Sequence, residues 1–311
     1  MELIKLTQNN IENIKESIVA TIGQFDGLHK AHLALIEKTM RIAKGKNLKS
    51  ALITFDPHPD FVLKKDLSNT YVTPLDEKIL ILNEIGLDYL IVIEFTKEVA
   101  NIKPIDFVIN YLIKNNVQEV VVGFDFSFGK FGKGKANDIS EMSKNKIKVN
   151  IIDEIKYNDK KIGTTLIKTL LKDGKVKTVK ELLGRNYKIS GQVVHGNHIG
   201  KTINLPTANL FVDEQFAYLC PGVYVVRVKI DGKRYFGFAN LGNNPSFNYS
   251  KNMIFETHIF NFSKDIYDKI IEIELLEFIR SEKKFSSVNE FLDQIAKDKE
   301  FAKNFCKKFL D

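Results

Sequence analysis

The stretch from Ile18 to Ala43 constrains the fold of this chain more than any other. Ile18–Ile22 is a short apolar run that is typical of a buried strand, and apolar residues recur at helical spacing from Leu33 to Ala43. Between the two runs lie Gly23 and Gly27. A buried strand that turns through glycines into a helix brings backbone N–H groups and a positive dipole end to one point. The sequence therefore predicts an anion-binding turn between a strand and a helix.

Two histidines follow this turn. His29 and His32 are three residues apart, so they share one face of the first helical turn. A phosphate bound at the turn would meet both imidazoles. The turn is not a Walker loop, because no Gly-Lys-Ser/Thr follows at the required offset. A polar helix start without any ligand is the alternative interpretation of the pair.

Strand-like runs and helical patterns alternate through the first part of the chain. Continuous apolar strands separated by helices are typical of a parallel sheet covered on both faces, so we expect an α/β domain. Ligands of such sheets bind at the carboxyl ends of the strands, which is where His58 and Asp125 are expected. The other expected strands are 51–55, 89–93, 119–123 and 149–152, and the expected helices are 74–86, 104–115 and 162–172.

The second part of the chain changes to β segments. Asp231-Gly232 is a hairpin signal between two of them, and Ser287–Glu290 is a capping box that starts a helix. Runs of strands followed by one helix predict a small antiparallel β-barrel with a C-terminal helix. The expected β segments are 189–194, 223–230, 233–239, 254–260 and 270–276.

Oxygen-bearing side chains mark two places in this second part. Thr207 and Asn209 follow Pro206 in a rigid turn, and a hydroxyl with an amide oxygen suits Mg²⁺ that keeps waters and phosphates as its other ligands. Glu256 and His258 alternate in a strand and therefore point to one face, where the carboxylate can accept a proton from an attacking hydroxyl. Stabilisation of the turn and a solvated carboxylate are the alternative interpretations.

A glycine-punctuated turn is the other candidate phosphate site of this part. It contains Gly196, Gly200 and Lys201, and a turn of this kind can wrap around phosphates.

Charge and cysteine content narrow the function classes. The net charge is +7, spread as 29 basic against 24 acidic residues in 1–185 and 17 against 15 in 186–311. This balance suits anionic small ligands and gives weak support for nucleic-acid binding. Two cysteines form neither a disulfide framework nor a metal motif. No apolar run reaches the ~18 residues of a spanning helix, and the N-terminus lacks a signal peptide's apolar core. We therefore expect a cytoplasmic location, with no membrane or nucleic-acid partner; the oligomeric state stays open.

Several short motifs run through the chain in a fixed order. In the first part they are Gly23-x-Phe25-Asp26-Gly27-x-His29-x-x-His32, Thr54–Pro59 and Val122–Gly129. In the second part they are Gly191–Gly196, Pro206–Leu210, Pro221–Tyr224, Ala239–Gly242, Glu256-x-His258 and Phe278–Phe285. Each motif is weak alone, but their joint occurrence across two domains is specific. With these motifs the chain, from about residue 12 to 305, resembles the prokaryotic bifunctional riboflavin kinase/FMN adenylyltransferase family, also called FAD synthetase.

The resemblance implies two enzyme domains. Residues 1–184 would be a Rossmann-like nucleotidylyltransferase domain that adenylylates FMN to FAD, and residues 185–311 a riboflavin kinase barrel that phosphorylates riboflavin to FMN. It implies riboflavin, FMN and ATP as small-molecule partners, Mg²⁺ as cofactor, and FMN and FAD as products.

The resemblance also implies roles for single residues of the kinase domain. Thr207 and Asn209 would hold Mg²⁺ on the ATP phosphates, and Glu256 would take the proton from the ribityl 5′-hydroxyl as it attacks the γ-phosphorus. Arg280 would lie near the flavin. Gly196, Gly200 and Lys201 would track the nucleotide phosphates.

In the adenylyltransferase domain, His29 and His32 would donate to the phosphates while the FMN phosphate attacks the α-phosphorus of ATP. His58 and Asp125 would place the nucleotide and the flavin. The implied ATP- and phosphate-binding residues are Gly23, Phe25, Gly27, Thr164, Thr165 and Lys168.

The chain departs from the family pattern mainly in its first domain. Ala31 replaces the glycine of His-x-Gly-His; its methyl group adds strain of about 1 kcal/mol if φ is positive there, and it favours the fold if the position is ordinary helix. Gly163 lacks a hydroxyl, and Lys168 keeps its charge but lacks the planar fork of arginine. In the barrel, Asn204-Leu205 replaces Gly-Phe, and 244–246 replaces Arg-Pro-Thr. A kinase with an impaired adenylyltransferase and a non-catalytic flavin- or nucleotide-binding regulator are therefore the alternatives to a bifunctional enzyme.

Overall fold

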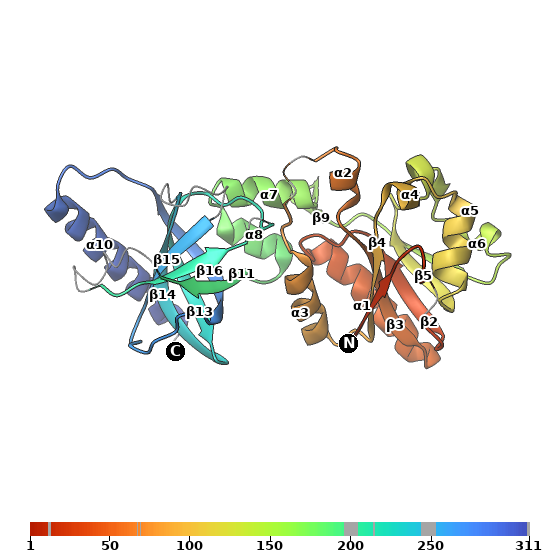
Figure 1. Ribbon diagram of the computed structural model, residues 1–311, viewed down its shortest axis with the longest axis horizontal. Helices are drawn as coiled ribbons and strands as arrows, with labels where there is room; N and C mark the ends of the chain where they lie inside the picture. The colour runs from red at the N-terminus through yellow and green to blue at the C-terminus, as the bar shows by residue number, and fades with distance from the viewer. Residues whose placement is uncertain are drawn as a thin grey trace. The chain divides into compact units, whose positions relative to one another are not determined.

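A computed structural model shows the fold (Figure 1) and describes residues 1–11, 14–66, 68, 70–195, 205–213, 215–243 and 253–309. These residues form two compact units, one of Met1–Asn69 with Thr73–Gly163 and one of Thr70–Val72 with Thr164–Asp311. The segment 164–184 thus packs with the second unit, whereas the assignment of 1–184 and 185–311 as functional domains stays a prediction.

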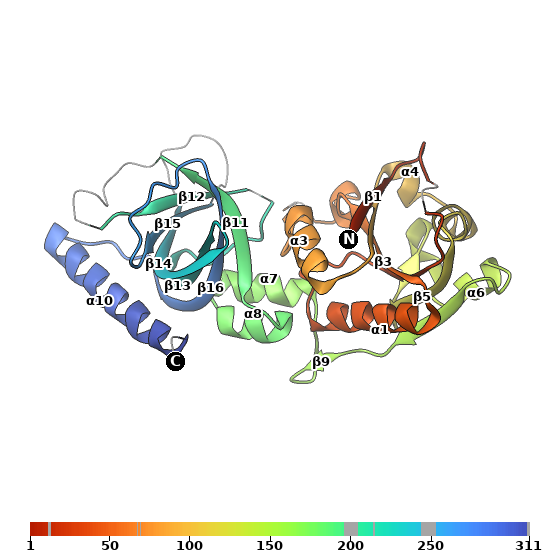
Figure 2. The same ribbon diagram turned by 90° about the horizontal axis from the view of Figure 1, so that it is seen from below.

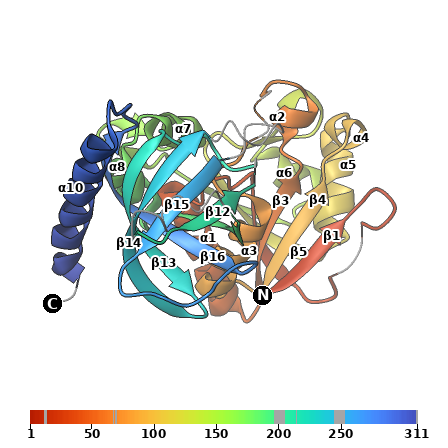
Figure 3. The same cartoon turned by 60° about the vertical axis from the view of Figure 1, so that its left-hand side comes forward.

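The first unit is built on a six-stranded parallel sheet, as the alternating pattern predicts. Its edge strand β1 (Glu2–Leu6) is an addition to the expected strands, and Figure 3 shows it beside β4. The strand order is β1, β4 (Tyr89–Glu94), β3 (Lys49–Asp56), β2 (Ile18–Ile22), β5 (Val117–Gly123) and β8 (Lys148–Ile152).

Side-chain alternation along the strands gives the sheet two apolar faces. On one face Leu52 and Leu90 pack with residues of α1 (Lys30–Lys46) and α3 (Leu75–Ile85). On the other face Ile53 and Ile91 pack with Phe107 and the segment that follows it. The remaining elements are α2 (Pro59–Val62), α4 (Lys97–Ala100), α5 (Pro104–Phe107), the π-helix η1 (Val108–Ile113), β6 (Ser127–Phe128), η2 (Lys130–Gly132), β7 (Gly134–Lys135), α6 (Asp138–Met142), β9 (Lys156–Tyr157) and β10 (Lys160–Lys161).

The order of the strands reverses at β2. The chain moves from β2 through β3 to β4 on one side and then places β5 on the other side of β2. Ligands of open α/β sheets bind outside the strand carboxyl ends at such a switch point. The glycine turn after β2 lies there.

The second unit is a closed antiparallel barrel, which confirms the predicted architecture. Figure 2 shows α10 (Val288–Cys306) along the outside of the barrel, where Ala302 and Cys306 pack on Val223 and Phe238. The barrel order is β11 (Tyr187–Val194), β12 (Ala208–Val212), β15 (Met253–Ile259), β14 (Lys233–Asn243), β13 (Gly222–Ile230) and β16 (Ile270–Ser281). This unit also contains α7 (Thr164–Lys172), α8 (Val176–Leu183) and η3 (Lys307–Phe309).

Local signals at the ends of the barrel elements behave as predicted. Asp231 and Gly232 both have positive φ, 48° and 77°, which matches a two-residue hairpin whose twist suits the strands. The Ser287 hydroxyl accepts the Glu290 N–H at 3.2 Å and so caps α10. Within the described residues, no helix is both long and apolar enough to cross a bilayer.

Candidate functional sites

The turn after β2 leads into α1 through His29. His29 is the N-cap of α1, and its Nδ1 accepts the backbone N–H of His32 at 3.4 Å. The two imidazoles stack with centroids 3.6 Å apart and planes inclined by 16°. The structure therefore brings the two predicted histidines together at the N-terminus of a 17-residue helix, where the dipole favours an anion.

The backbone of this turn adopts an unusual conformation. Phe25, Gly27 and Leu28 all have positive φ, at 50°, 86° and 43°. Gly27 suits such a conformation because it has no Cβ. The Phe25 side chain is 1% exposed and its ring lies 4.9 Å from that of His32, so the ring supports the histidine from inside. The structure thus gathers Gly23, Phe25 and Gly27, as predicted, in one turn.

Ala31 lies in the first turn of α1 with an ordinary helical backbone, since it is absent from the described residues with positive φ. The methyl group therefore adds no strain. We expect Ala31→Gly to lower the free energy of unfolding by up to about 1 kcal/mol, the propensity difference between the two residues in a helix. FAD formation should not rise. Thermal unfolding and a FAD assay check this, and a rise in FAD formation would contradict it.

A cavity of about 620 Å³ in the same unit is lined by aromatic rings. His58 and Asp125, predicted to place nucleotide and flavin, are not among its lining residues, but their sequence neighbours Pro59 and Phe126 are. His58 caps α2 by accepting the Asp60 N–H at 3.0 Å, and Asp125 forms an ion pair with Lys161. The phenylalanines that line the cavity are Phe55, Phe95, Phe107, Phe126, Phe128 and Phe131.

Thr164, Thr165 and Lys168 lie on α7, which belongs to the second compact unit. The Lys168 ammonium donates to the carbonyl oxygen of Thr70 at 2.5 Å within that unit. The role of these residues in adenylyl transfer stays a prediction.

In the barrel, strand pairing places the predicted residues in one row. Asn209 of β12 is paired with Glu256 of β15, and Glu256 is paired on its other side with Asn240 of β14. Directly paired residues of antiparallel strands point to the same face. Val223 of β13 continues the row and is itself paired with Arg280 of β16. Asn209 thus lies in a strand and not in the expected turn, because Ala208 already pairs with β15.

A pocket of about 300 Å³ lies on this face of the barrel. Thr207, Glu256 and Arg280, all predicted from sequence, line it together with Asn240 and Phe285. The Arg280 guanidinium donates to both carboxylate oxygens of Asp298 on α10, at distances from 2.7 to 3.1 Å. This ion pair joins the pocket to the C-terminal helix and holds the arginine in a fixed orientation.

The electrostatics of the pocket favour a base. Desolvation raises the pKa of the Glu256 carboxyl above its usual value. Burial lowers the pKa of His258, which is 8% exposed and has Nδ1 2.9 Å from the carbonyl oxygen of Pro206. His258, which lies two residues after Glu256 in the same strand, therefore anchors the turn that carries Thr207.

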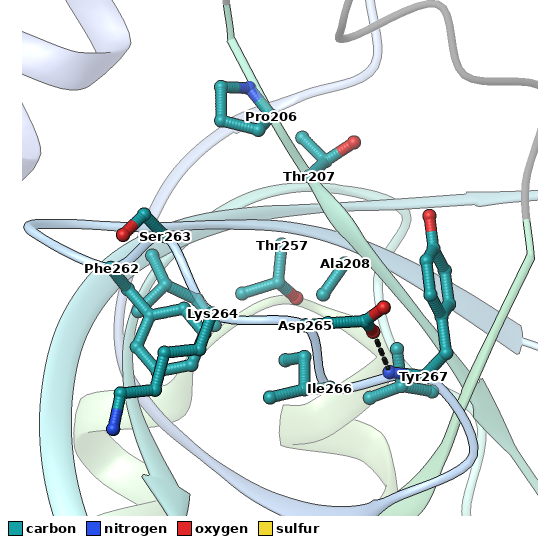
Figure 4. A pocket seen from close by; sticks show the side chains of 12 residues that line it. Pro206, Thr207, Ala208, Thr257, Phe262, Ser263, Lys264, Asp265, Ile266 and Tyr267 are labelled. Carbon is teal, nitrogen blue, oxygen red and sulfur yellow. Dashed lines mark hydrogen bonds between the residues drawn. The ribbon is translucent and has the colours of Figure 1, made fainter.

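A second barrel pocket, of about 350 Å³, meets the first at Thr207, which lines both. Figure 4 shows Thr207, Phe262 and Tyr267 around it, with the Asp265 carboxylate accepting the Tyr267 N–H at 2.9 Å. The ring of His195 stacks on that of Tyr267 at 3.9 Å. The predicted phosphate turn with Gly196, Gly200 and Lys201 lies outside the described residues, as do 204 and 244–246.

Asn240, Phe126 and Phe128 line pockets but were absent from the predicted site residues. Asn240 lies in the motif Ala239–Gly242, so its signal was present in the sequence. The alternation of Phe126 and Phe128 reads equally well as ordinary core, and Phe128 is indeed only 5% exposed. Among the described residues, no group of three or more His, Cys, Asp or Glu side chains is placed to hold a metal ion.

The chain matches two family models in consecutive order. The model described as FAD synthetase matches residues 11–166, and the model described as riboflavin kinase matches residues 183–306. A crystal structure described as a macrolide-efflux protein from Streptococcus pneumoniae has a TM-score of 0.89 and 30% identity, covering 97% of this chain and 99% of that one. This structural similarity supports the fold along nearly the whole chain.

Curated bacterial relatives named bifunctional riboflavin kinase/FMN adenylyltransferase also match along nearly their whole length. The Listeria monocytogenes protein is 36% identical over 294 residues, which are 94% of each chain. The Bacillus subtilis protein is 36% identical over 308 residues, 97% of each chain, and the Escherichia coli K12 protein is 31% identical over 98% of each chain. Together with the two domain matches, these relatives show that the chain belongs to the bifunctional riboflavin kinase/FMN adenylyltransferase family.

Proposed function

We propose that this chain makes FAD from riboflavin in two steps. Its barrel transfers the γ-phosphoryl group of ATP to riboflavin, and its α/β domain transfers the adenylyl group of a second ATP to FMN and releases pyrophosphate. The observation that carries the kinase assignment is the junction of two barrel pockets at Thr207, beside Glu256. Incubation with riboflavin, ATP and Mg²⁺, followed by separation of the flavins, tests both steps.

The two barrel pockets suit the two kinase substrates. The pocket with Tyr267, Phe262 and Ile259 offers apolar and aromatic walls for a purine ring. The pocket with Glu256, Arg280 and Phe285 would take the flavin. The reacting hydroxyl and the γ-phosphate would then meet near Thr207, which lies where the pockets join.

Glu256 is the proposed base of the kinase step. The ribityl 5′-hydroxyl is too weak an acid to ionise at neutral pH, so its proton must move to a base as it attacks the γ-phosphorus. A raised pKa makes the Glu256 carboxylate a stronger proton acceptor than an ordinary glutamate. Asn209 and Asn240, paired with Glu256 on the two sides, frame the carboxylate with neutral side chains.

The hydroxyl of Thr207 and the amide oxygen of Asn209 fit a hard cation. These oxygens are of the kind that Mg²⁺ accepts alongside waters and substrate phosphates. When bound there, Mg²⁺ would neutralise charge on the phosphates of ATP. Thr207, which lies at the junction of the two pockets, and Asn209, which is paired with Glu256, would hold it.

The histidine turn is the proposed site of adenylyl transfer. The FMN phosphate is already an anion, so it attacks the α-phosphorus without a base, and the P–O bond to pyrophosphate breaks. Catalysis then depends on positioning and on donors for the charge that builds on the oxygens. His29, His32 and the N-terminus of α1 supply these donors at one point.

The phenylalanine cavity is the proposed seat of the FMN ring in this domain. Phe131 lines it and is 83% exposed, so its ring is accessible for stacking on a ligand. Aromatic pairs contribute about 0.5–1.5 kcal/mol. We therefore expect Phe131→Ala to raise KM for FMN about two- to tenfold with little change in kcat.

Phe124→Ala is the matched control, because Phe124 is another exposed ring, 50% exposed, that does not line the cavity. It should leave KM for FMN unchanged. An unchanged KM in Phe131→Ala, or an equal rise in both variants, would contradict the placement of FMN in this cavity.

A further inference from the structure

Lys78 is buried beneath the turn that precedes the two histidines. It lies in the first turn of α3 and is 2% exposed. Lysine is almost never fully buried unless it is paired, because removing an ammonium from water is costly. The hydrogen bonds that offset this cost show which part of the structure the Lys78 side chain stabilises.

The ammonium of Lys78 binds the backbone of the turn. Its Nζ donates to the carbonyl oxygen of Gln24 at 2.9 Å and lies 3.4 Å from Oγ1 of Thr54. The Thr54 hydroxyl donates to the same carbonyl oxygen at 3.0 Å. Two donors thus fix the peptide between Gln24 and Phe25. Because the C=O and N–H of a trans peptide point in opposite directions, a carbonyl drawn toward Lys78 turns the Phe25 N–H away from it.

Two carboxylates, the buried Asp26 and the half-buried Asp56, complete this cluster. Asp26, 3% exposed, accepts the Thr73 N–H at 2.9 Å and so ties the turn to the segment before α3. Asp26 and Asp56, at the end of β3, both favour the charged form of Lys78. The turn is therefore held through Lys78 and Thr54 at Gln24 and through Thr73 at Asp26.

We propose that Lys78 is a positioning residue for adenylyl transfer, which holds the Gln24–Gly27 turn so that its amides and the His29–His32 pair face one phosphate. The inference rests on the proposed adenylyltransferase function. Lys78 acts through the carbonyl of Gln24, one residue before the strained Phe25, whose ring in turn supports His32.

Lys78 also gives the site a distinctive response to pH. Burial lowers the pKa of Lys78 to about 8, although Asp26 and Asp56 oppose the shift. Above this pH the ammonium loses its charge and its hold on Gln24 weakens, so adenylyl transfer should fall. Between pH 8 and about 10.4, Lys78 binds more protons in the unfolded chain than in the folded one, so its contribution to the free energy of unfolding increases with pH. Deprotonation of Lys78 should therefore lower activity in this pH range without destabilising the fold.

The test compares wild type, Lys78→Met and Thr54→Val from pH 6.5 to 9.5. Wild type should lose FMN-to-FAD kcat/KM above pH 8, whereas Lys78→Met should be at least tenfold lower at pH 7 and show no loss centred near pH 8. Thr54→Val removes the second donor to the same carbonyl and should lower kcat/KM in the same direction. Riboflavin phosphorylation, measured in the same samples, should not change in either variant.

Lys46→Met is the matched control, because Lys46 pairs with the 4%-exposed side chain of Glu119 in the same unit and is the last residue of α1, at the end opposite to the turn. It should keep the wild-type pH profile. Calorimetric titration with pyrophosphate gives a second readout that needs no turnover, and Lys78→Met should bind it at least tenfold more weakly. Wild-type affinity in that variant, or a Lys78→Met profile equal to that of wild type, would overturn the inference. Absence of FAD in wild type would instead refute the proposed function, and the titration alone would then decide on Lys78.

Discussion

Glu256→Gln should slow FMN formation by about 10²–10⁴-fold and leave FMN-to-FAD conversion within about twofold of wild type. Glutamine keeps the shape of the side chain and its place between Asn209 and Asn240, but it cannot take a proton. A positioned general base contributes about 10²–10⁴-fold to rate, and we expect kcat for riboflavin phosphorylation to fall by this factor. Separate assays that start from riboflavin and from FMN measure the two steps.

The pH dependence of the wild-type kinase is a second test of this role. Glu256 must be ionised to act as a base, and its pKa is raised by desolvation. FMN formation should therefore fall as the pH is lowered through that raised value. Glu272→Gln, which removes a barrel carboxylate paired with Lys188, is the matched control and should keep the wild-type profile. Equal loss of both reactions in Glu256→Gln would contradict separate kinase and adenylyltransferase sites.

His29→Asn should reduce FMN-to-FAD conversion by about 10²–10³-fold, the usual cost of removing one preorganised donor to a developing anion. Asparagine is a good N-cap, so the start of α1 is kept while the imidazole is lost. The variant therefore separates the chemical role of His29 from its structural role. Riboflavin phosphorylation in the same preparation is the internal control.

Two further variants separate the role of the imidazoles in adenylyl transfer from the role of His29 as a helix cap. His32→Asn should also reduce FAD formation, because the two rings stack at 3.6 Å and face the same point. His29→Ala should behave like His29→Asn in activity but should also be less stable by about 1 kcal/mol, because the cap is lost. Near-wild-type FAD formation in His29→Asn would show that the capping hydrogen bond is the only role of His29.

The departures of this chain from its family pattern differ in how strongly they suggest an impaired adenylyltransferase. Ala31 lies in ordinary helix, so it is compatible with an intact anion site. Lys168 is bound to the carbonyl of Thr70 within the second compact unit, and Gly163 lies just before α7. If adenylyl transfer is impaired in this chain, we expect the cause to lie in the segment 163–168 and not in the histidine turn.

The sequence was most informative where a local signal acts alone. The buried runs of β2 and β4, the Asp231-Gly232 hairpin and the Ser287 cap were all predicted because strand burial, positive φ and capping are properties of a few adjacent residues. The strand β12 was missed, because Pro206 and the small residues after it read as a turn. Its pairing with β15 depends on residues some 45 positions later.

Sites that depend on distant packing could not be predicted. A lysine at Lys78 reads as part of a solvated helix face, and only the fold shows that Gln24 and Thr54 surround it. The phenylalanine cavity combines Phe55, Phe95, Phe107 and Phe131 from four separate segments, so no spacing along the chain reveals it. In the barrel, by contrast, the row of Asn209, Glu256 and Asn240 follows motifs that the sequence already marks.

The most direct test of the bifunctional assignment is to incubate the protein with ATP and Mg²⁺ and either riboflavin or FMN, and to separate the flavins by chromatography. We expect riboflavin to give FMN and then FAD, and FMN alone to give FAD with one pyrophosphate released per FAD. FMN that accumulates without FAD from both starting flavins would contradict adenylyl transfer, and unchanged riboflavin and FMN would contradict both activities.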